Sequence, residues 1–309
     1  MIIVANRTDF FFTSSTGDVE IHAAKWEGAE KKAVFQINHG MAEHIERYEG
    51  FAQFLADNGF VVYANDHIGH GKSINETYKP GFFGMDNTEG AVFADDCKLL
   101  TDIAKEENPG LPYFFFGHSM GSFVARRYGA LYGDGLKGLV VCGTGGPNPA
   151  NGIAIFLANV ISKIKGVEAD GKFINGLAFG SYNKRTEKRT GFDWLTKDEA
   201  IVDKYIDDPL CGFLFSNRGF RDMLTLLKFV NSADCYNATK KDLPIFLIAG
   251  KEDPVGPYGT GVEKVFDAYK KNGNPAEIKL YEGDRHEILN ELDKDQVMAD
   301  ILAWCNKLI

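Results

Sequence analysis

Residues 112–122 read PYFFFGHSMGS, and this stretch decides the fold. The bulky apolar run over 113–116 predicts a buried strand, and Gly117 to Gly121 then follow the pattern Gly-x-Ser-x-Gly. Glycine on both sides of a serine permits a turn too tight for larger residues, and the apolar spacing after the turn predicts a helix. We therefore expect Ser119 at a sharp strand-to-helix elbow, presented as a nucleophile. The alternative is a serine that only caps the helix.

A serine hydroxyl is a weak nucleophile near neutral pH, so catalysis requires a histidine base and an acid that orients it. In α/β-hydrolases both follow the serine, the acid first, and each comes after a strand. Residues 243–250 and 277–283 have strand patterns and run into Lys-Glu-Asp-Pro and Asp-Arg-His. We predict Asp253 as the acid and His286 as the base. Two neighbouring carboxylates remain alternative acids: Glu252 and Asp284.

Acyl transfer also requires two backbone N–H groups that bind the negative oxygen of the transition state. One is expected from Met120, the residue after the nucleophile. The other is expected from Met41, because residues 33–40 (AVFQINHG) predict an earlier strand whose following loop begins there. His39 and His44 are expected to shape this loop through hydrogen bonds.

The string HGMAEHIERY at 39–48, together with GHSMGS at 117–122, resembles the monoacylglycerol lipase and lysophospholipase family of serine hydrolases. That family has the pattern His-Gly-x-x-Glu-His-x-x-Arg-Tyr. NDHIGHGKS at 65–73, KEDPVG at 251–256 and RHEILNE at 285–291 are similar to further segments of the family. The resemblance extends from about residue 33 to residue 291 and is weakest between residues 147 and 236.

This resemblance implies monoacylglycerol or lysophospholipid substrates. The functional residues that it implies are the same ones that we predict from their positions after the strands. The implied triad is Ser119, Asp253 and His286, and the implied oxyanion residues are Met41 and Met120. One departure is that Met41 and Ala42 stand where the family often has small residues or glycine. We expect this difference to narrow the pocket at the acyl carbon.

Strand and helix patterns alternate along the chain, which predicts an α/β-hydrolase fold with a mostly parallel eight-stranded sheet and helices on both faces. Residues 9–25 predict an antiparallel hairpin at the sheet edge. Residues 1–146 and 237–309 are expected to form this core.

Residues 147–236 are too many for a simple crossover and have helical periodicity, so they predict a helical cap inserted over the serine. Within it, residues 153–164 are apolar on most of the helix circumference, and 218–230 are amphipathic. Thr196 and Glu199 have the spacing of a capping box. Contact of the cap with a membrane surface is a hypothesis. The residues expected to contact substrate are His39, Phe156, Leu157, Phe213, Phe215 and Leu226.

Composition excludes several functions. The net charge of −9 and the absence of a dense basic cluster argue against a nucleic-acid partner. The Gly-Lys-Ser at 71–73 is not a phosphate-binding loop, because Asp66 stands where that motif needs glycine. Asp66, His67 and His70 could be metal ligands together with His39 and His44, but no cysteine joins them and no HExxH helix exists. Neither a metal nor a cofactor is therefore expected. Five scattered cysteines and a start without signal-peptide character predict a cytoplasmic protein.

We therefore predict a serine carboxylic-ester hydrolase that forms an acyl-enzyme with a small ester substrate carrying an apolar acyl group. A short-chain carboxylesterase or thioesterase, a proline-type aminopeptidase or a cofactor-free haloperoxidase on the same scaffold remain alternatives. The peptidase would use cap carboxylates such as Glu168, Asp170 or Glu199 to hold a substrate amine. An alternative of another class is a small-ligand-binding protein with this fold and no turnover. Oligomeric state has no signal in the sequence.

Overall fold

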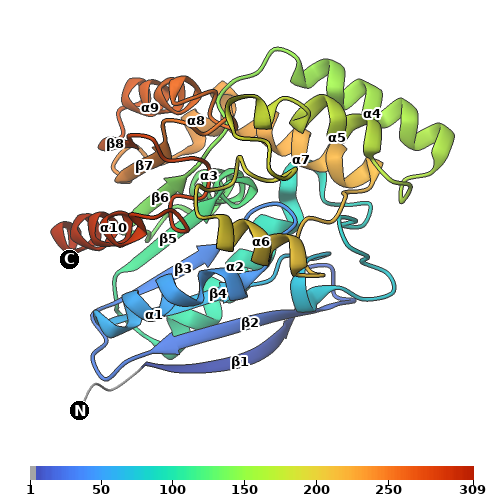
Figure 1. Ribbon diagram of the computed structural model, residues 1–309. Helices are drawn as coiled ribbons and strands as arrows, with labels where there is room; N and C mark the ends of the chain where they lie inside the picture. Colours follow the sequence, from blue (N-terminus) through green and yellow to red (C-terminus); the bar gives the residue numbers. More distant parts are fainter. Residues whose placement is uncertain (1–4) are drawn as a thin grey trace.

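The computed structural model describes residues 5–309, which form one eight-stranded sheet covered by helices (Figure 1). Residues 1–4 of the predicted core lie outside the described residues. The strands lie in the order β1-β2-β4-β3-β5-β6-β7-β8. The hairpin of β1 (Asn6–Thr13) and β2 (Glu20–Glu27) is antiparallel, and β2 also pairs antiparallel with β4 (Phe60–Asn65). The other neighbours are parallel: β3 (Ala33–Asn38), β5 (Tyr113–His118), β6 (Gly138–Cys142), β7 (Ile245–Gly250) and β8 (Ala276–Tyr281).

The predicted mostly parallel sheet with an antiparallel edge hairpin is thus confirmed. The central strands of this sheet are buried on both faces, and most of their residues are apolar. In β5, Phe114 and Phe116 pack into the core on one face, and Tyr113 and Phe115 pack into the core on the other. A strand of this kind holds its carboxyl end firmly, and Ser119 follows that end.

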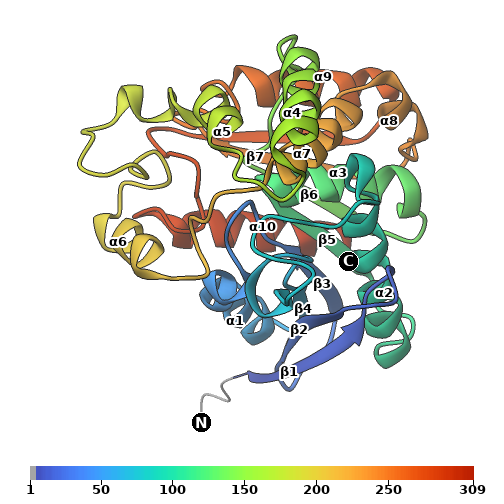
Figure 2. The ribbon, with the colours of Figure 1, turned by 90° about the vertical axis from the view of Figure 1, so that its right-hand side faces the viewer.

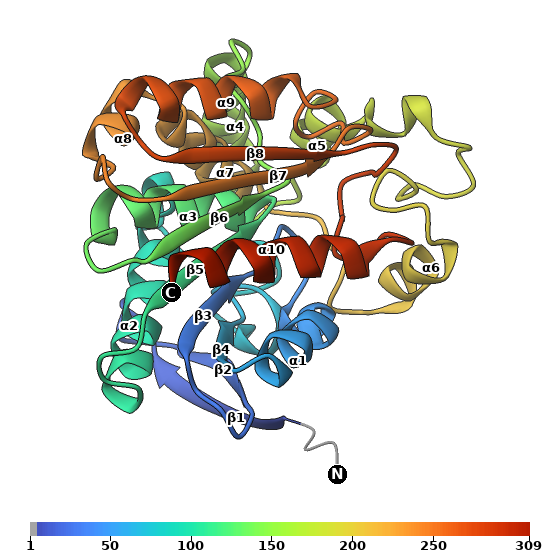
Figure 3. The same cartoon turned by 90° about the vertical axis from the view of Figure 1, so that its left-hand side faces the viewer.

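Helices cover both faces of the sheet. The helices α1 (Glu49–Asp57) and α10 (Lys294–Leu308) lie on one face (Figure 3), and α2 (Ala91–Glu107), α3 (Met120–Tyr132) and α9 (Thr260–Asn272) lie on the other. Short 3₁₀ helices occur at η1 (Ile45–Tyr48), η2 (Gly71–Ser73), η3 (Thr88–Gly90) and η4 (Tyr182–Arg185).

The chain between β6 and β7 contains five α-helices. The helices α5 and α6 lie near the end of the sheet where the parallel strands finish, whereas α8 lies beside α9 (Figures 2 and 3). Among the five helices, α4 packs directly on α7. Their bounds are α4 (Asn151–Lys165), α5 (Lys172–Phe179), α6 (Glu199–Asp207), α7 (Asn217–Val230) and α8 (Ala233–Ala238). Across residues 5–309, every helix is too short or too polar to cross a membrane.

The predicted capping box at the start of α6 is wrong. Asp198 is the N-cap, and its carboxylate accepts from the backbone N–H groups of Ala200 and Ile201 at 3.0 and 3.3 Å. The Thr196 hydroxyl instead donates to the carbonyl oxygen of Asn290 at 3.0 Å. Aspartate is as good an N-cap as threonine, and here tertiary contact engages the threonine elsewhere.

Candidate active site

The turn at Ser119 has a strained backbone that its two glycines make possible. Ser119 has φ +52° and ψ −119°, a conformation that residues other than glycine rarely adopt. A Cβ atom on Gly117 would lie 2.0 Å from the carbonyl oxygen of Gly121, and one on Gly121 would lie 2.3 Å from that of Asn38. The Ser119 N–H donates to the carbonyl oxygen of Cys142 at 3.0 Å. The serine is thereby held half-buried between β5 and α3.

The two predicted partners of the serine meet at the ends of neighbouring strands. Asp253 follows β7, His286 follows β8, and the Nδ1 atom of His286 lies 3.0 Å from Oδ1 of Asp253. Both side chains are buried, and the same Asp253 oxygen accepts from the N–H of Val255 at 2.8 Å. A carboxylate beside Nδ1 favours the tautomer that leaves Nε2 free to accept a proton. Ser119 and His286 line one cavity.

The alternative acids occupy other surroundings. Glu252 is exposed to solvent. Burial, together with the nearby carboxylates of Asp293 and Glu291, raises the pKa of Asp284 to about 7. Within the described part of the chain, the carboxylate that faces the ring of His286 is that of Asp253.

The loop after β3 passes directly over the nucleophile. A Cβ atom on Gly40 would lie 3.1 Å from Cβ of Ser119 and 2.7 Å from a carboxylate oxygen of Glu43. Ala42 has φ +51°, so the chain reverses sharply after Met41. Met41 and Met120 both line the cavity that contains Ser119. The geometry therefore brings the two predicted oxyanion residues to the serine.

The carboxylate of Glu43 holds this loop from beneath. It accepts from the Gly40 N–H, from the hydroxyl of Tyr48 at 2.7 Å and from Arg47 at 2.5 Å, and it lies 3.4 Å from Nδ1 of His118. Burial by itself would raise the pKa of Glu43, but the positive charge of Arg47 and the contact with His118 hold that pKa well below its ordinary value. Glu43 is therefore a buried anion with partners on every side.

Arg47 extends this ion pair to the loop that carries the histidine. Its guanidinium also contacts both carboxylate oxygens of Glu287 at 2.6 Å, and Glu287 directly follows His286. A second link is the side chain of His118, whose Nε2 lies 3.2 Å from the carbonyl oxygen of His286. The oxyanion loop, the elbow and the histidine loop thus share one buried polar network.

The sequence analysis assigns no role to the residues of this network, although all of them stand in the quoted motifs HGMAEHIERY, GHSMGS and RHEILNE. Motif spacing alone does not show which charged residues pair across the fold. The residues concerned are Glu43, Arg47, Tyr48, His118 and Glu287.

The cavity at Ser119 has a volume of about 880 Å³ and is lined mainly by apolar side chains. Of the six residues predicted to contact substrate, Leu157 and Phe213 line it. Lining residues that the sequence analysis did not name include Ile174, Phe179, Trp194, Met223, Leu224 and Leu227.

The other four predicted contact residues do not line the cavity. Phe156 points away from it and is 65% exposed, because the apolar circumference of α4 did not reveal which side faces inward. Phe215 and Leu226 are fully buried in the core beneath the cavity. His39 is also buried: its Nδ1 contacts the carbonyl oxygen of Gly40 at 2.8 Å, and its Nε2 accepts from the N–H of His67.

Residues 29–293 match the family model Hydrolase_4, described as "Serine aminopeptidase, S33". The chain belongs to this family. A monoacylglycerol lipase of Mycolicibacterium smegmatis is 26% identical over 98% of both chains. The human monoglyceride lipase is also 26% identical, over 89% of this chain and 83% of its own length.

Solved structures agree with this assignment. A highly thermostable carboxyl esterase from Bacillus coagulans, in complex with glycerol, superimposes with a TM-score of 0.91 at 33% identity over 98% of both chains. A structure described as a lipase in an open form has a TM-score of 0.87 at 28% identity, over 98% of this chain and 99% of the other. The predicted α/β-hydrolase fold and the resemblance to lipase-type serine hydrolases are confirmed.

Replacing Glu43 by Gln should lower the free energy of unfolding at pH 7 by on the order of 3 kcal/mol, because Arg47 loses a buried anionic partner. The folded-state pKa of Glu43 is lowered, so its contribution is present above the unfolded value of about 4.3 and is lost as the pH falls through the folded value. Urea unfolding of both proteins between pH 7 and pH 3 measures the difference.

The matched control is Glu30→Gln, which removes an exposed carboxylate and should change stability by no more than about 0.5 kcal/mol. An E43Q protein as stable as the wild type at pH 7, or a difference that grows on acidification, contradicts the network described above.

Proposed function

We propose that the protein is a carboxylic-ester hydrolase in which Ser119 forms an acyl-enzyme. One observation carries this proposal: the strained Ser119 and His286, whose ring lies beside Asp253, line one apolar cavity together with Met41 and Met120. Esterases and lipases among the similar proteins support the same activity.

The reaction follows from the roles of these groups. Nε2 of His286 takes the hydroxyl proton of Ser119 as Oγ attacks the ester carbonyl carbon. The N–H groups of Met41 and Met120 bind the resulting oxyanion, and Asp253 stabilises the imidazolium. The imidazolium then protonates the departing alcohol as the C–O bond breaks. Water then enters, gives a proton to His286 and attacks the acyl carbon. The imidazolium returns this proton to Oγ of Ser119 as the bond between Oγ and the acyl carbon breaks, which releases the acid and the free serine.

The cavity favours an ester with a substantial apolar acyl group. A volume of about 880 Å³ is in the range of sites for drug-sized molecules, and its walls include Phe213, Leu224 and Leu227. Monoacylglycerols and lysophospholipids combine such a chain with a small polar alcohol. We propose monoacylglycerol-type lipids as substrates, as the names of the similar lipases suggest.

The aminopeptidase alternative lacks a carboxylate placed for a substrate amine. Glu168, Asp170 and Glu199 do not line the cavity, and Glu168 forms an ion pair with a lysine at 2.8 Å. Among the described residues, the carboxylates that do line it are those of Glu43 and Glu287, and both are paired with Arg47. The site therefore favours esters over peptides, whatever the family description says of other members.

We further propose that residues 147–236 form a cap and that its outer surface contacts lipid surfaces. In α4 and α5 five large apolar side chains are exposed, and two of them, Ile153 and Leu177, also line the cavity. Contact of these side chains with a membrane or micelle would place the cavity beside the lipid that it binds. The five exposed side chains are Ile153, Phe156, Ile164, Phe173 and Leu177.

We also propose a cytoplasmic location, supported by five cysteines that are all free and buried.

Ser119→Ala should abolish labelling by a fluorophosphonate probe and lower p-nitrophenyl ester turnover by at least about 10⁴-fold, because the attacking oxygen is gone. The control is Ser162→Ala, which removes a hydroxyl of α4 that does not line the cavity and should label like wild type. A wild-type protein without labelling would support a binding protein, and full labelling of S119A would place the nucleophile elsewhere.

A substrate panel separates the lipase from the peptidase. We expect kcat/KM for monoacylglycerols to rise with acyl length until the chain fills the cavity, because each added methylene buries more apolar surface. A proline aminoacyl amide should not be cleaved above background. Preference for the amide, or a rate independent of acyl length, would contradict the assignment.

Phe156→Ser combined with Ile164→Ser should reduce sedimentation with phosphatidylcholine vesicles, because both side chains are exposed on α4. Ile155 and Leu157 are unsuitable for this test, since both pack against the core. The control is Leu292→Ser, an exposed leucine outside α4 and α5. Wild-type protein that stays in the supernatant, or equal sedimentation of all three proteins, removes the membrane proposal.

A further inference from the structure

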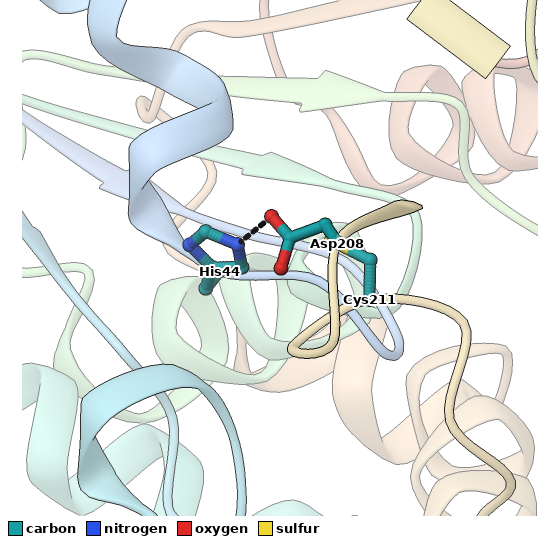
Figure 4. A group of neighbouring side chains, drawn as sticks. All are labelled: His44, Asp208 and Cys211. Atoms are coloured by element: carbon teal, nitrogen blue, oxygen red, sulfur yellow. Dashed lines mark hydrogen bonds and ion pairs between the residues drawn. The ribbon is translucent and has the colours of Figure 1, made fainter. Parts of the chain in front are cut away.

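A second group of polar side chains lies just outside the cavity, where the oxyanion loop meets the segment after α6. His44 comes from the loop, and Asp208 and Cys211 come from that segment (Figure 4). The imidazole of His44 points at the carboxylate, with Nε2 2.8 Å from Oδ2 of Asp208, and Cys211 lies beside them. None of the three lines the cavity at Ser119.

One nitrogen, one oxygen and one sulfur ligand atom converge here within 4.8 Å of one another. Around a tetrahedral zinc ion, at bond lengths of about 2.0–2.3 Å, such atoms lie roughly 3.5 Å apart. The side chains would have to move by on the order of 1 Å to enclose an ion. Binding the ion would break the hydrogen bond between His44 and Asp208 and would release the thiol proton of Cys211.

The surroundings suit a bound cation. The side chain of His44 is 6% exposed, while that of Asp208 is 31% exposed, so the group is closed toward the protein and open to solvent at the carboxylate. That opening provides an entry route and room for a water ligand. The carboxylate is already oriented, because its other oxygen accepts from the N–H of Leu210 at 2.8 Å. Cys211 is buried beside the other two groups.

We propose that His44, Asp208 and Cys211 form a binding site for a borderline transition-metal ion such as Zn²⁺, with solvent as the fourth ligand. A donor set of imidazole, carboxylate and thiolate disfavours Mg²⁺ and Ca²⁺, which bind oxygen ligands. Zinc sites that exchange a ligand, such as catalytic sites, typically have three protein ligands and one position open to water or substrate.

Such an ion would fasten two parts of the molecule that surround the cavity. His44 stands two residues after Ala42, whose carbonyl oxygen accepts from the N–H of Gly212 at 2.9 Å and from the hydroxyl of Tyr205 at 3.1 Å. Gly212 and the next residue, Phe213, line the cavity. Zinc would thus reinforce the existing link between the oxyanion loop and the cavity wall.

The test uses the full chain, stripped with a chelator and titrated with Zn²⁺ or Co²⁺. We expect one ion per chain by calorimetry and a melting temperature raised by roughly 5 °C at 100 times the dissociation constant. The Co²⁺ form should show thiolate-to-cobalt absorption in the near ultraviolet. This band identifies the site, because among residues 5–309 no cysteine lines the catalytic cavity.

Cys211→Ser should remove the thiolate band, and Asp208→Asn should weaken Zn²⁺ binding at least about tenfold. Asp207→Asn is the matched control: it makes the same charge change at the adjacent exposed position and should bind like wild type. Circular dichroism of each metal-free variant reports its folding.

If C211S does not fold, the Co²⁺ spectrum of the wild-type protein still shows whether a thiolate binds the metal. A wild-type protein without one-to-one binding or without the thiolate band overturns the proposal, as does a folded C211S or D208N protein that binds Zn²⁺ normally. The His44–Asp208 contact is then a hydrogen bond without a metal role.

Discussion

The tight turn at Ser119 is the constraint on which the rest of the site depends. The backbone there can adopt φ +52° because Gly117 and Gly121 leave no side chains in positions that other backbone atoms fill. Strain of about 1–3 kcal/mol at such a residue persists only when the surroundings fix it. Here β5 enters the turn buried on both faces, and α3 leaves it packed against the sheet. The strained serine is therefore rigidly presented, and the other groups need only be brought to it.

A buried ionic network brings the oxyanion loop and the histidine loop to that point. Burying Glu43, Arg47 and Glu287 costs desolvation energy, and well-packed apolar residues would stabilise the core at least as well. The charged groups instead hold three segments at fixed distances from one another. Their contacts include Gly40 in the oxyanion loop, His118 in the elbow and Glu287 in the histidine loop. The network thus accounts for how segments more than 200 residues apart in the chain keep their positions around one cavity.

The sequence predicted those parts whose signal is local. Consecutive apolar residues identified the buried strands, and the acid and the histidine could be placed because each directly follows a strand. Elements whose position depends on contacts distant in the chain could not be predicted. The Arg47–Glu287 pair spans 240 positions and the His44–Asp208 pair spans 164, so neither leaves a spacing pattern. In α4 the apolar residues surround the helix, so periodicity could not tell outward Phe156 from inward Leu157.

A crystal structure of the protein after reaction with a fluorophosphonate tests the central claim most directly. We expect phosphorus bonded to Oγ of Ser119, and one phosphonyl oxygen within hydrogen-bond distance of both the Met41 and Met120 nitrogens. We also expect Nε2 of His286 to face the modified serine, with Nδ1 still beside Asp253. A modified residue other than Ser119, or a phosphonyl oxygen that neither amide contacts, would contradict the central claim.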